Sequence, residues 1–297
     1  MKLAIIGSSG FVGRHLTAMC LKRSIDLVCI NRKSCSVSIP QGCTSRIEFV
    51  TCNPAEDDLS AYIENCDGVI CLSAIRPIKS FGLDEYLVNL RICGNVMESC
   101  IRAHQKNCVL ISSRSVYSNQ DQPWMENEKN IPLNLYGAAK AAADDLMEYY
   151  NAHFEMNFKS LRLAQVMGTD EVKGYLLNTL IDNASKKNRS TIYGSGCGKR
   201  QYIYINDVVS AILAAVSHPD QKGIFNIGIE EPVSIADLAA LIYEVFDDPN
   251  NFEFDLSKTE DTRCYQMSTA AAFDQLEFKP EFSVRSALQD IRNNLEQ

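Results

Sequence analysis

A tyrosine and a lysine four positions apart could carry acid–base chemistry in this chain. Tyr136 and Lys140 stand in the segment Tyr-Gly-Ala-Ala-Lys, and this spacing puts both side chains on one face of a helix. A free phenol has a pKa of about 10 and is a poor base at neutral pH. An ammonium one helical turn away stabilises the phenolate form. Tyr136 could therefore exchange a proton with an alcohol or a ketone while a hydride moves at the same carbon.

A pair of serines provides the third group that this chemistry needs. Ser112 and Ser113 end an apolar run that predicts a buried strand over 109–112. Because ligands of parallel sheets lie at the carboxyl ends of the strands, we expect Ser113 to hydrogen-bond the reacting oxygen there. A tyrosine and a lysine at this spacing also occur by chance as an exposed pair on a helix. The catalytic interpretation therefore depends on the elements around them.

A glycine-rich turn follows the first predicted strand, at residues 3–6. Gly7, Gly10 and Gly13 are spaced G-x-x-G-x-x-G, and residues 15–22 continue at helical spacing. In a dinucleotide site the first glycine closes the turn, the second leaves room for a pyrophosphate, and the third lets the helix approach the strand. The helix N-terminus offers unpaired N–H groups to the pyrophosphate. The turn predicts a nicotinamide dinucleotide site, in which Lys140 could also hold ribose hydroxyls.

The end of the second predicted strand, 26–30, bears on the choice of cofactor. NAD sites usually carry an acidic residue there, which accepts hydrogen bonds from the ribose 2′-hydroxyl. This chain has Asn31, Arg32 and Lys33 instead. Because two cations attract a 2′-phosphate, the sequence favours NADP over NAD, with NAD still possible. The alternative is an ordinary solvated basic turn.

Strand and helix patterns alternate through the first half of the chain. Further strands are expected at 47–51, 68–72 and 158–163, and helices at 57–65, 84–104, 136–153, 174–187, 206–217 and 234–247. This alternation predicts an α/β fold, a doubly wound parallel Rossmann sheet, with a smaller interwoven α/β substrate-binding lobe. We expect residues 1–165 plus about 201–228 to form the dinucleotide domain. Residues from about 166 to 200 plus 229–297 are expected to form the lobe.

Composition excludes several other classes of protein. The chain has 297 residues, 46% of them apolar and 22% charged, with a net charge of −8, so neither nucleic acid nor an anionic membrane is the expected partner. No run approaches the roughly 20 apolar residues of a membrane span. Twelve scattered cysteines and a strand that begins directly after Met1 indicate a reduced, cytoplasmic protein without a signal peptide. Four distant histidines give no metal-ligand spacing, so no metal is expected.

Taken together, these motifs resemble the extended short-chain dehydrogenase/reductases, the NAD-dependent epimerase/dehydratase family. The glycine turn resembles T-G-x-x-G-F-x-G with Ile6 in place of Thr, residues 67–74 resemble D-x-V-I-H-L-A-A, and Asn89 with residues 94–95 resembles N-x-x-G-T-x-N. Ser113, Tyr136 and Lys140 fall on the family's catalytic Ser/Thr, Tyr and Lys. The cofactor site implied in this way consists of Gly7, Ser9, Gly10, Phe11, Val12, Gly13, Asn31, Arg32, Lys33, Leu72, Ser73, Ala74, Asn89, Tyr136 and Lys140.

The resemblance also implies a nucleotide-diphosphate sugar as substrate. Arg200 falls on the arginine that grips the diphosphate, and Tyr193 on the aromatic residue that packs on the base. Gln165 replaces the family's Asn in R-x-x-N-V-x-G, and Lys258 replaces the arginine of R-x-G-D, where Arg263 is an alternative phosphate ligand. The remaining expected substrate residues are Ser113 and Arg76. Arg76 and Lys79 are the two cations of the loop after the fourth strand, where they could meet phosphate or could simply be solvated.

Three activities are known on this scaffold, and the sequence separates them in part. Dehydratases of the family carry Asp-Glu after the catalytic Thr, whereas Arg114 and Ser115 follow Ser113 here, which argues against dehydration. The cations at 32–33 favour a reductase of a keto-sugar nucleotide. An epimerase that retains its cofactor is the first alternative, and a non-catalytic cofactor-binding protein is the second. The resemblance further implies a homodimer that pairs the helices at 84–104 and 136–153.

Overall fold

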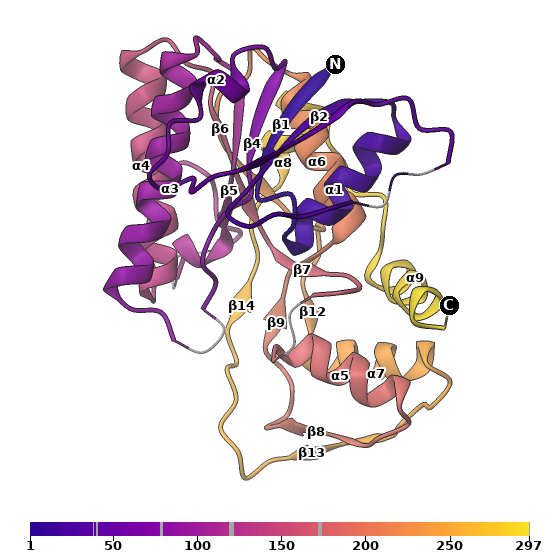
Figure 1. The fold of residues 1–297 in the computed structure, drawn as a ribbon. Helices are drawn as coiled ribbons and strands as arrows, with labels where there is room; N and C mark the ends of the chain where they lie inside the picture. The colour runs from indigo at the N-terminus through magenta and orange to yellow at the C-terminus, as the bar shows by residue number, and fades with distance from the viewer. Residues whose placement is uncertain (38, 40, 78–79, 119–121, 172–173, 297) are drawn as a thin grey trace.

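A seven-stranded parallel sheet forms the centre of the chain (Figure 1). The structure is a computed structural model that describes residues 1–37, 39, 41–77, 80–118, 122–171 and 174–296, so Lys79 lies outside the described residues. The strands, in their order across the sheet, are β11 (Gly223–Ile227), β6 (Lys159–Leu163), β5 (Cys108–Ser113), β4 (Gly68–Cys71), β1 (Lys2–Ile6), β2 (Asp26–Asn31) and β3 (Ile47–Thr51). This arrangement confirms the expected doubly wound Rossmann architecture.

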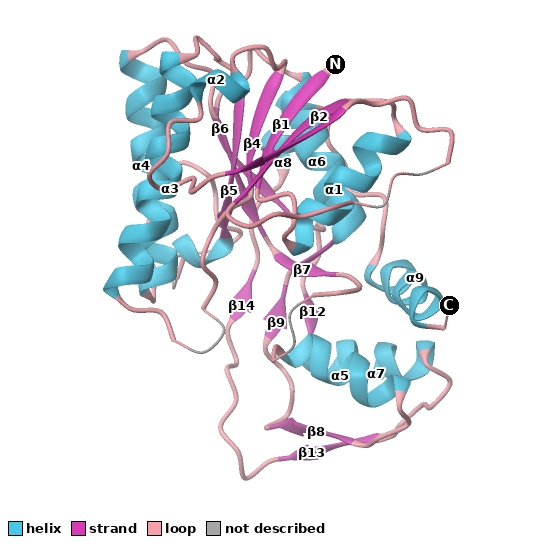
Figure 2. Cartoon of the chain, in the orientation of Figure 1, coloured by secondary structure: helices cyan, strands magenta, loops and turns pink. Residues whose placement is uncertain are grey.

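Helices cover both faces of the sheet (Figure 2). One face carries α2 (Ser60–Ile63), α3 (Leu83–Arg102) and α4 (Leu135–His153), and the other carries α1 (Phe11–Lys22) and α6 (Ile205–Ser217). Strand β1 illustrates why the sheet is buried on both sides. Leu3 and Ile5 join one core, whereas Ala4 and Ile6 join the other, since successive side chains of a strand point to opposite faces.

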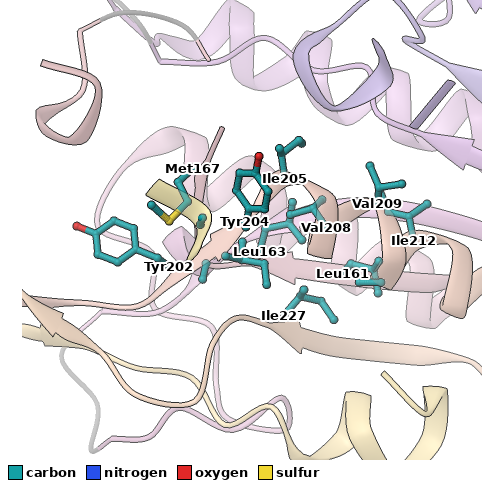
Figure 3. Packing of buried hydrophobic residues seen from close by; sticks show 14 of the residues in the cluster. Leu161, Leu163, Met167, Tyr202, Tyr204, Ile205, Val208, Val209, Ile212 and Ile227 are labelled. Atoms are coloured by element: carbon teal, nitrogen blue, oxygen red, sulfur yellow. The ribbon is translucent and has the colours of Figure 1, made fainter. Parts of the chain in front are cut away.

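The core on the α1 and α6 side continues toward the second half of the chain (Figure 3). Val208 and Ile212 of α6 pack there with Leu161 of β6 and Ile227 of β11. Residues 205–227 therefore return to the sheet built by the first half, after an excursion that begins at β7 (Gln165–Met167). The domain boundaries expected from the sequence remain predictions.

A smaller set of elements lies beyond the carboxyl end of the sheet (Figures 1 and 2). Its strands pair as β7 with β10 (Tyr202–Tyr204), β9 (Lys199–Arg200) with β12 (Val233–Ser234) and β14 (Cys264–Tyr265), and β8 (Ser190–Tyr193) with β13 (Phe252–Asp255). Its helices are α5 (Leu176–Ser185), α7 (Ile235–Val245) and α9 (Val284–Leu295), while α8 (Ala270–Leu276) packs near β11 and α6. Across the described ranges, no helix combines the length and apolar character needed to cross a membrane.

The order of the strands determines where a ligand fits. The chain adds β2 and β3 on one side of β1, and then β4, β5, β6 and β11 on the other side. The connections therefore diverge between β1 and β4, which opens a crevice at the carboxyl ends of these two strands. The turn after β1, the loop after β4 and the end of β5 all meet at this crevice.

Candidate active site

The glycine turn after β1 has no room for side chains at two of its three glycines. Gly7 has a φ of +92°, and a Cβ there would lie 2.8 Å from Ser73 Oγ. A Cβ on Gly13 would lie 2.3 Å from the carbonyl oxygen of Gly7. Gly7 is thus required by the backbone conformation and by the loop after β4, and Gly13 by the approach of α1 to the turn.

The turn presents the start of α1 to the crevice. Gly10 is the N-cap of α1, and as a glycine it has no side chain that could cap the helix. The first N–H groups of a helix have no acceptor within the helix, and its N-terminus carries a partial positive charge. Phe11 and Val12 line the cavity at this point. These features fit the pyrophosphate of a dinucleotide.

The three residues at the end of β2 divide into two roles. The buried Asn31 side chain accepts a hydrogen bond from Ser9 N at 3.0 Å and donates one to Ser8 Oγ at 2.8 Å. Asn31 therefore holds the glycine turn in place, and its amide is committed to the protein. Arg32 and Lys33 are exposed and form no ion pair within the described part of the chain. Both side chains therefore lie in solvent at the end of β2.

The loop after β4 is held by a buried asparagine. Asn89 of α3 accepts a hydrogen bond from Ile75 N at 2.7 Å and donates one to Ile75 O at 2.9 Å. This pair of bonds fixes the segment in which Leu72 and Ala74 line the cavity and Ser73 touches Gly7. Asn89 thus acts through the loop that it positions.

Ser113, Tyr136 and Lys140 line one cavity of about 290 Å³. Ser113 ends β5, while Tyr136 and Lys140 lie in the first turns of α4, whose N-cap Asn134 accepts a hydrogen bond from Gly137 N at 2.8 Å. A Cβ on Gly137 would lie only 2.0 Å from the backbone oxygen of Ser115. The start of α4 therefore packs directly on the segment that follows Ser113, and this close contact brings the three side chains together.

Lys140 is a buried ammonium beside the tyrosine. Its Nζ donates a hydrogen bond to the backbone oxygen of Ile111 at 2.6 Å and lies 5.9 Å from the centre of the Tyr136 ring. Burial alone would lower the pKa of Lys140, but the electrostatic influence of the acidic groups around it, Tyr136, Cys93, Cys71 and Asp144, together outweighs burial and raises the pKa above its ordinary value. Lys140 is therefore charged at neutral pH, as stabilisation of a phenolate requires.

The hydroxyl of Ser113 faces its own turn. Ser113 Oγ accepts a hydrogen bond from Ser115 N and donates one to Ser115 Oγ, both at 3.2 Å. These bonds orient the serine while leaving an acceptor site on its oxygen. A substrate hydroxyl between Ser113 and Tyr136 could then be held by one residue and exchange its proton with the other.

A buried ion pair supports the catalytic helix from behind. Asp144 of α4 accepts hydrogen bonds from Arg162 Nε at 2.9 Å and from Ser112 Oγ at 3.2 Å. Arg162 Nη1 donates to Tyr117 OH at 2.6 Å. Burial raises the pKa of Asp144, and Arg162 opposes this effect. The network ties α4 to β5 and β6, and it was not found from the sequence because its members stand far apart in the chain.

The lining of the cavity combines the expected Arg76 with three residues that the sequence analysis did not assign to the site, namely Glu171, Tyr175 and Arg114. Arg76 Nη1 is paired with Glu171 at 2.6 Å, and its guanidinium lies 5.4 Å from the centre of the Tyr175 ring. Arg114 also lines the cavity. Its position directly after Ser113 was the signal that could have identified it, whereas Glu171 and Tyr175 follow β7 in a turn that carries no motif.

The expected substrate residues are placed differently from one another. Gln165 lines the cavity, as Arg76 and Ser113 do. Tyr193, Arg200 and Lys258 are outside its lining. Arg200 is tied to Asp261 by an ion pair of 2.9 Å, and Tyr193 and Lys258 are exposed. The expected roles of these three residues in binding a diphosphate and a base remain predictions.

Comparisons with known proteins agree with this architecture. The NAD dependent epimerase/dehydratase family matches residues 3–228. An uncharacterised UDP-glucose epimerase of Bacillus subtilis, YtcB, is 26% identical over 300 residues, which cover 91% of this chain and 94% of that protein.

Two solved structures share the fold over the whole chain. The UDP-N-acetylglucosamine 4-epimerase of Bacillus cereus has a TM-score of 0.85 at 22% identity, covering 100% of this chain and 96% of the other. MoeE5 in complex with UDP-glucose and NAD has a TM-score of 0.85 at 23% identity, covering 100% and 99%. The match over most of the chain, together with the sheet and the site at its carboxyl edge, shows that the protein is an enzyme of the NAD dependent epimerase/dehydratase family.

Proposed function

We propose that this enzyme interconverts an alcohol and a ketone on the sugar of a nucleotide-diphosphate sugar, with Tyr136 as the general acid/base. The observation that carries the proposal is the meeting of Ser113, Tyr136 and Lys140 in one cavity at the carboxyl edge of the sheet. The start of α1 opens into the same cavity through Phe11 and Val12. A cofactor site and a proton-transfer site thus share one space.

Each catalytic residue has a distinct task in this mechanism. Ser113 holds the reacting oxygen, and Tyr136 accepts its proton on oxidation or returns one on reduction. Lys140 stabilises the phenolate and has donors for the ribose hydroxyls. A nicotinamide bound along the α1 turn supplies the chemistry of hydride transfer.

Two reactions use this chemistry, and different observations favour each. Oxidation, turning of the keto sugar and reduction on its other face make an epimerase, which the similarity to UDP-glucose and UDP-N-acetylglucosamine epimerases supports. A single reduction with exchange of the cofactor makes a reductase. The exposed cations Arg32 and Lys33 favour the reductase because they suit NADP, whereas NAD is the cofactor bound in MoeE5. We therefore propose a nucleotide-sugar epimerase or keto-sugar nucleotide reductase.

One experiment separates these two reactions. The purified chain is incubated with UDP-glucose without added cofactor, and in parallel with a 4-keto sugar nucleotide and either NADPH or NADH. An epimerase converts UDP-glucose to an isomer without net change in cofactor. A reductase consumes reduced cofactor, with NADPH used faster than NADH if the cations bind a 2′-phosphate. If neither an isomer nor a reduced product forms with any of a panel of nucleotide sugars, the proposed function is refuted.

The assembly and location are also part of the proposal. We infer a cytoplasmic homodimer. All twelve cysteines are free thiols, which suits a reducing compartment. Large apolar side chains are exposed on the two helices that the family resemblance assigns to the dimer, namely Leu83, Leu87, Leu135 and Tyr149.

A further inference from the structure

Arg114 is a cation whose guanidinium has no hydrogen-bonded or ionic partner among the residues that the structure describes. Arg114 directly follows Ser113 and lines the cavity. Its backbone oxygen accepts a hydrogen bond from Tyr117 N, but its guanidinium forms no hydrogen bond or ion pair with any described residue. The two arginines that were expected to bind substrate do form ion pairs, Arg76 with Glu171 and Arg200 with Asp261. A half-buried guanidinium has five N–H donors, and leaving them without acceptors is unfavourable.

The surroundings of Arg114 are strongly positive. Its guanidinium lies 4.6 Å from the centre of the Tyr265 ring, and those of Arg200 and Arg263 lie 4.3 Å and 5.1 Å from the same centre. Asp261 is the one carboxylate that pairs with this group among the described residues, with ion pairs of 2.9 Å to Arg200 and 2.7 Å to Arg263. Three guanidinium charges thus face one carboxylate.

The ring that carries these cations is held firmly. Tyr265 packs edge-on against the buried Trp124, with 5.7 Å between ring centres, and its hydroxyl donates a hydrogen bond to Asp261 at 2.9 Å. Burial, with repulsion from Arg200, lowers the pKa of Arg114, although an arginine stays charged at any physiological pH. The fold therefore holds an uncompensated positive charge in place next to the catalytic serine.

We propose that Arg114 binds an oxyanion carried by the substrate, either a phosphate of the nucleotide diphosphate or a carboxylate on the sugar, and thereby selects which nucleotide sugars react. A guanidinium suits both groups because its parallel N–H donors match two oxygens. The inference rests on the proposed function, since the reacting sugar is assigned to Ser113. It adds a specificity residue, next to Ser113 in the chain, that the glycine turn and the catalytic triad do not predict.

Binding measurements test this inference independently of turnover. Calorimetry on the full chain with UDP, UDP-glucose and UDP-glucuronic acid compares the wild type with Arg114→Ala and Arg114→Lys. Arg285→Ala is the matched control, because Arg285 forms an exposed ion pair with Glu244 outside the cavity. We expect Arg114→Ala to weaken binding by about 10- to 100-fold, the effect of one charge-assisted interaction. Arg114→Lys should recover part of this loss.

The pattern of the loss identifies the source of the oxyanion. An equal loss for all three compounds assigns Arg114 to the diphosphate. A loss confined to UDP-glucuronic acid assigns it to a sugar carboxylate. If the wild type binds these compounds and Arg114→Ala binds them within twofold, the inference is wrong while the proposed function stands. If the wild type binds neither these compounds nor any other nucleotide sugar, the proposed function fails as well.

Discussion

Lys159 shows how a single buried charge can act against stability. It begins β6, at the end of the sheet away from the cavity, and is fully buried with Nζ donating to Asn107 Oδ1 at 2.9 Å and to Asn157 O at 3.1 Å. It has no ion pair with a carboxylate in the described ranges. Burial lowers the pKa of Lys159 to about 8. The protein therefore bears the cost of burying this cation at neutral pH.

The sign of the pH effect follows from this lowered pKa. Below about pH 8, Lys159 is protonated in both the folded and the unfolded chain, so burial of the charge lowers the free energy of unfolding by its full amount. As the pH rises toward the ordinary lysine pKa of about 10.4, the folded chain loses this proton first, and the destabilisation disappears. We expect Lys159→Met to raise the free energy of unfolding at pH 7 by about 1–3 kcal/mol. This net gain already includes the loss of the hydrogen bond to Asn107. The gain should shrink by pH 9.5.

Urea unfolding under reducing conditions at the two pH values measures this difference. Lys106→Met is the matched control, since Lys106 is an exposed lysine with only a long contact of 3.9 Å to Glu155. A Lys159→Met protein that is less stable than the wild type at pH 7, by an amount independent of pH, would contradict the account of Lys159 as a destabilising cation.

At the scale of elements, α4 has two faces with different tasks. Its inner face carries Tyr136, Lys140 and Asp144 toward the sheet, whereas its outer face exposes Tyr149. Helix α3 packs beside α4 (Figure 1), and its Leu87 is also exposed. Burying such side chains against a second copy is favourable, since about 25 cal/mol is gained per Å² of apolar surface.

We expect the wild type to sediment at about twice the chain mass of 33.1 kDa. The double variant Leu87→Glu/Tyr149→Glu should sediment as a monomer, because it places charges in the apolar contact. Phe273→Glu, on the exposed side of α8, is the control and should leave the dimer intact. A wild-type monomer at micromolar concentration would refute the dimer.

At the scale of the whole molecule, local patterns predicted the sheet well and the long-range contacts poorly. The apolar runs placed β3 at Ile47–Thr51 without error and five other strands within about a residue at each end, because buried parallel strands are continuous in sequence. Ser234, at the start of the helix expected over 234–247, caps α7 by accepting a hydrogen bond from Asp237 N at 3.0 Å. The predicted helix at 57–65 is shorter, Ser60–Ile63, and α8 and α9 were not predicted.

The cavity itself could be predicted only in part. Residues that follow strands, such as Phe11, Ala74 and Ser113, are brought together by topology alone. The hydrogen bonds of Asn31 to the glycine turn and the ion pair of Arg200 with Asp261 join residues that are distant in the sequence, so no local pattern predicts them. The environment of Arg114 likewise depends on Tyr265, which stands far along the chain.

The central claim is that the Tyr136 phenol transfers the proton during hydride transfer. The most direct measurement compares kcat of the wild type, Tyr136→Phe and Tyr149→Phe on the nucleotide sugar that the enzyme turns over. Loss of a general acid/base should lower kcat of Tyr136→Phe by about 10²- to 10⁴-fold, with substrate and cofactor binding within about twofold of the wild type. Tyr149→Phe, on the outer face of the same helix, should be unaffected. A Tyr136→Phe enzyme with the wild-type kcat would contradict the account.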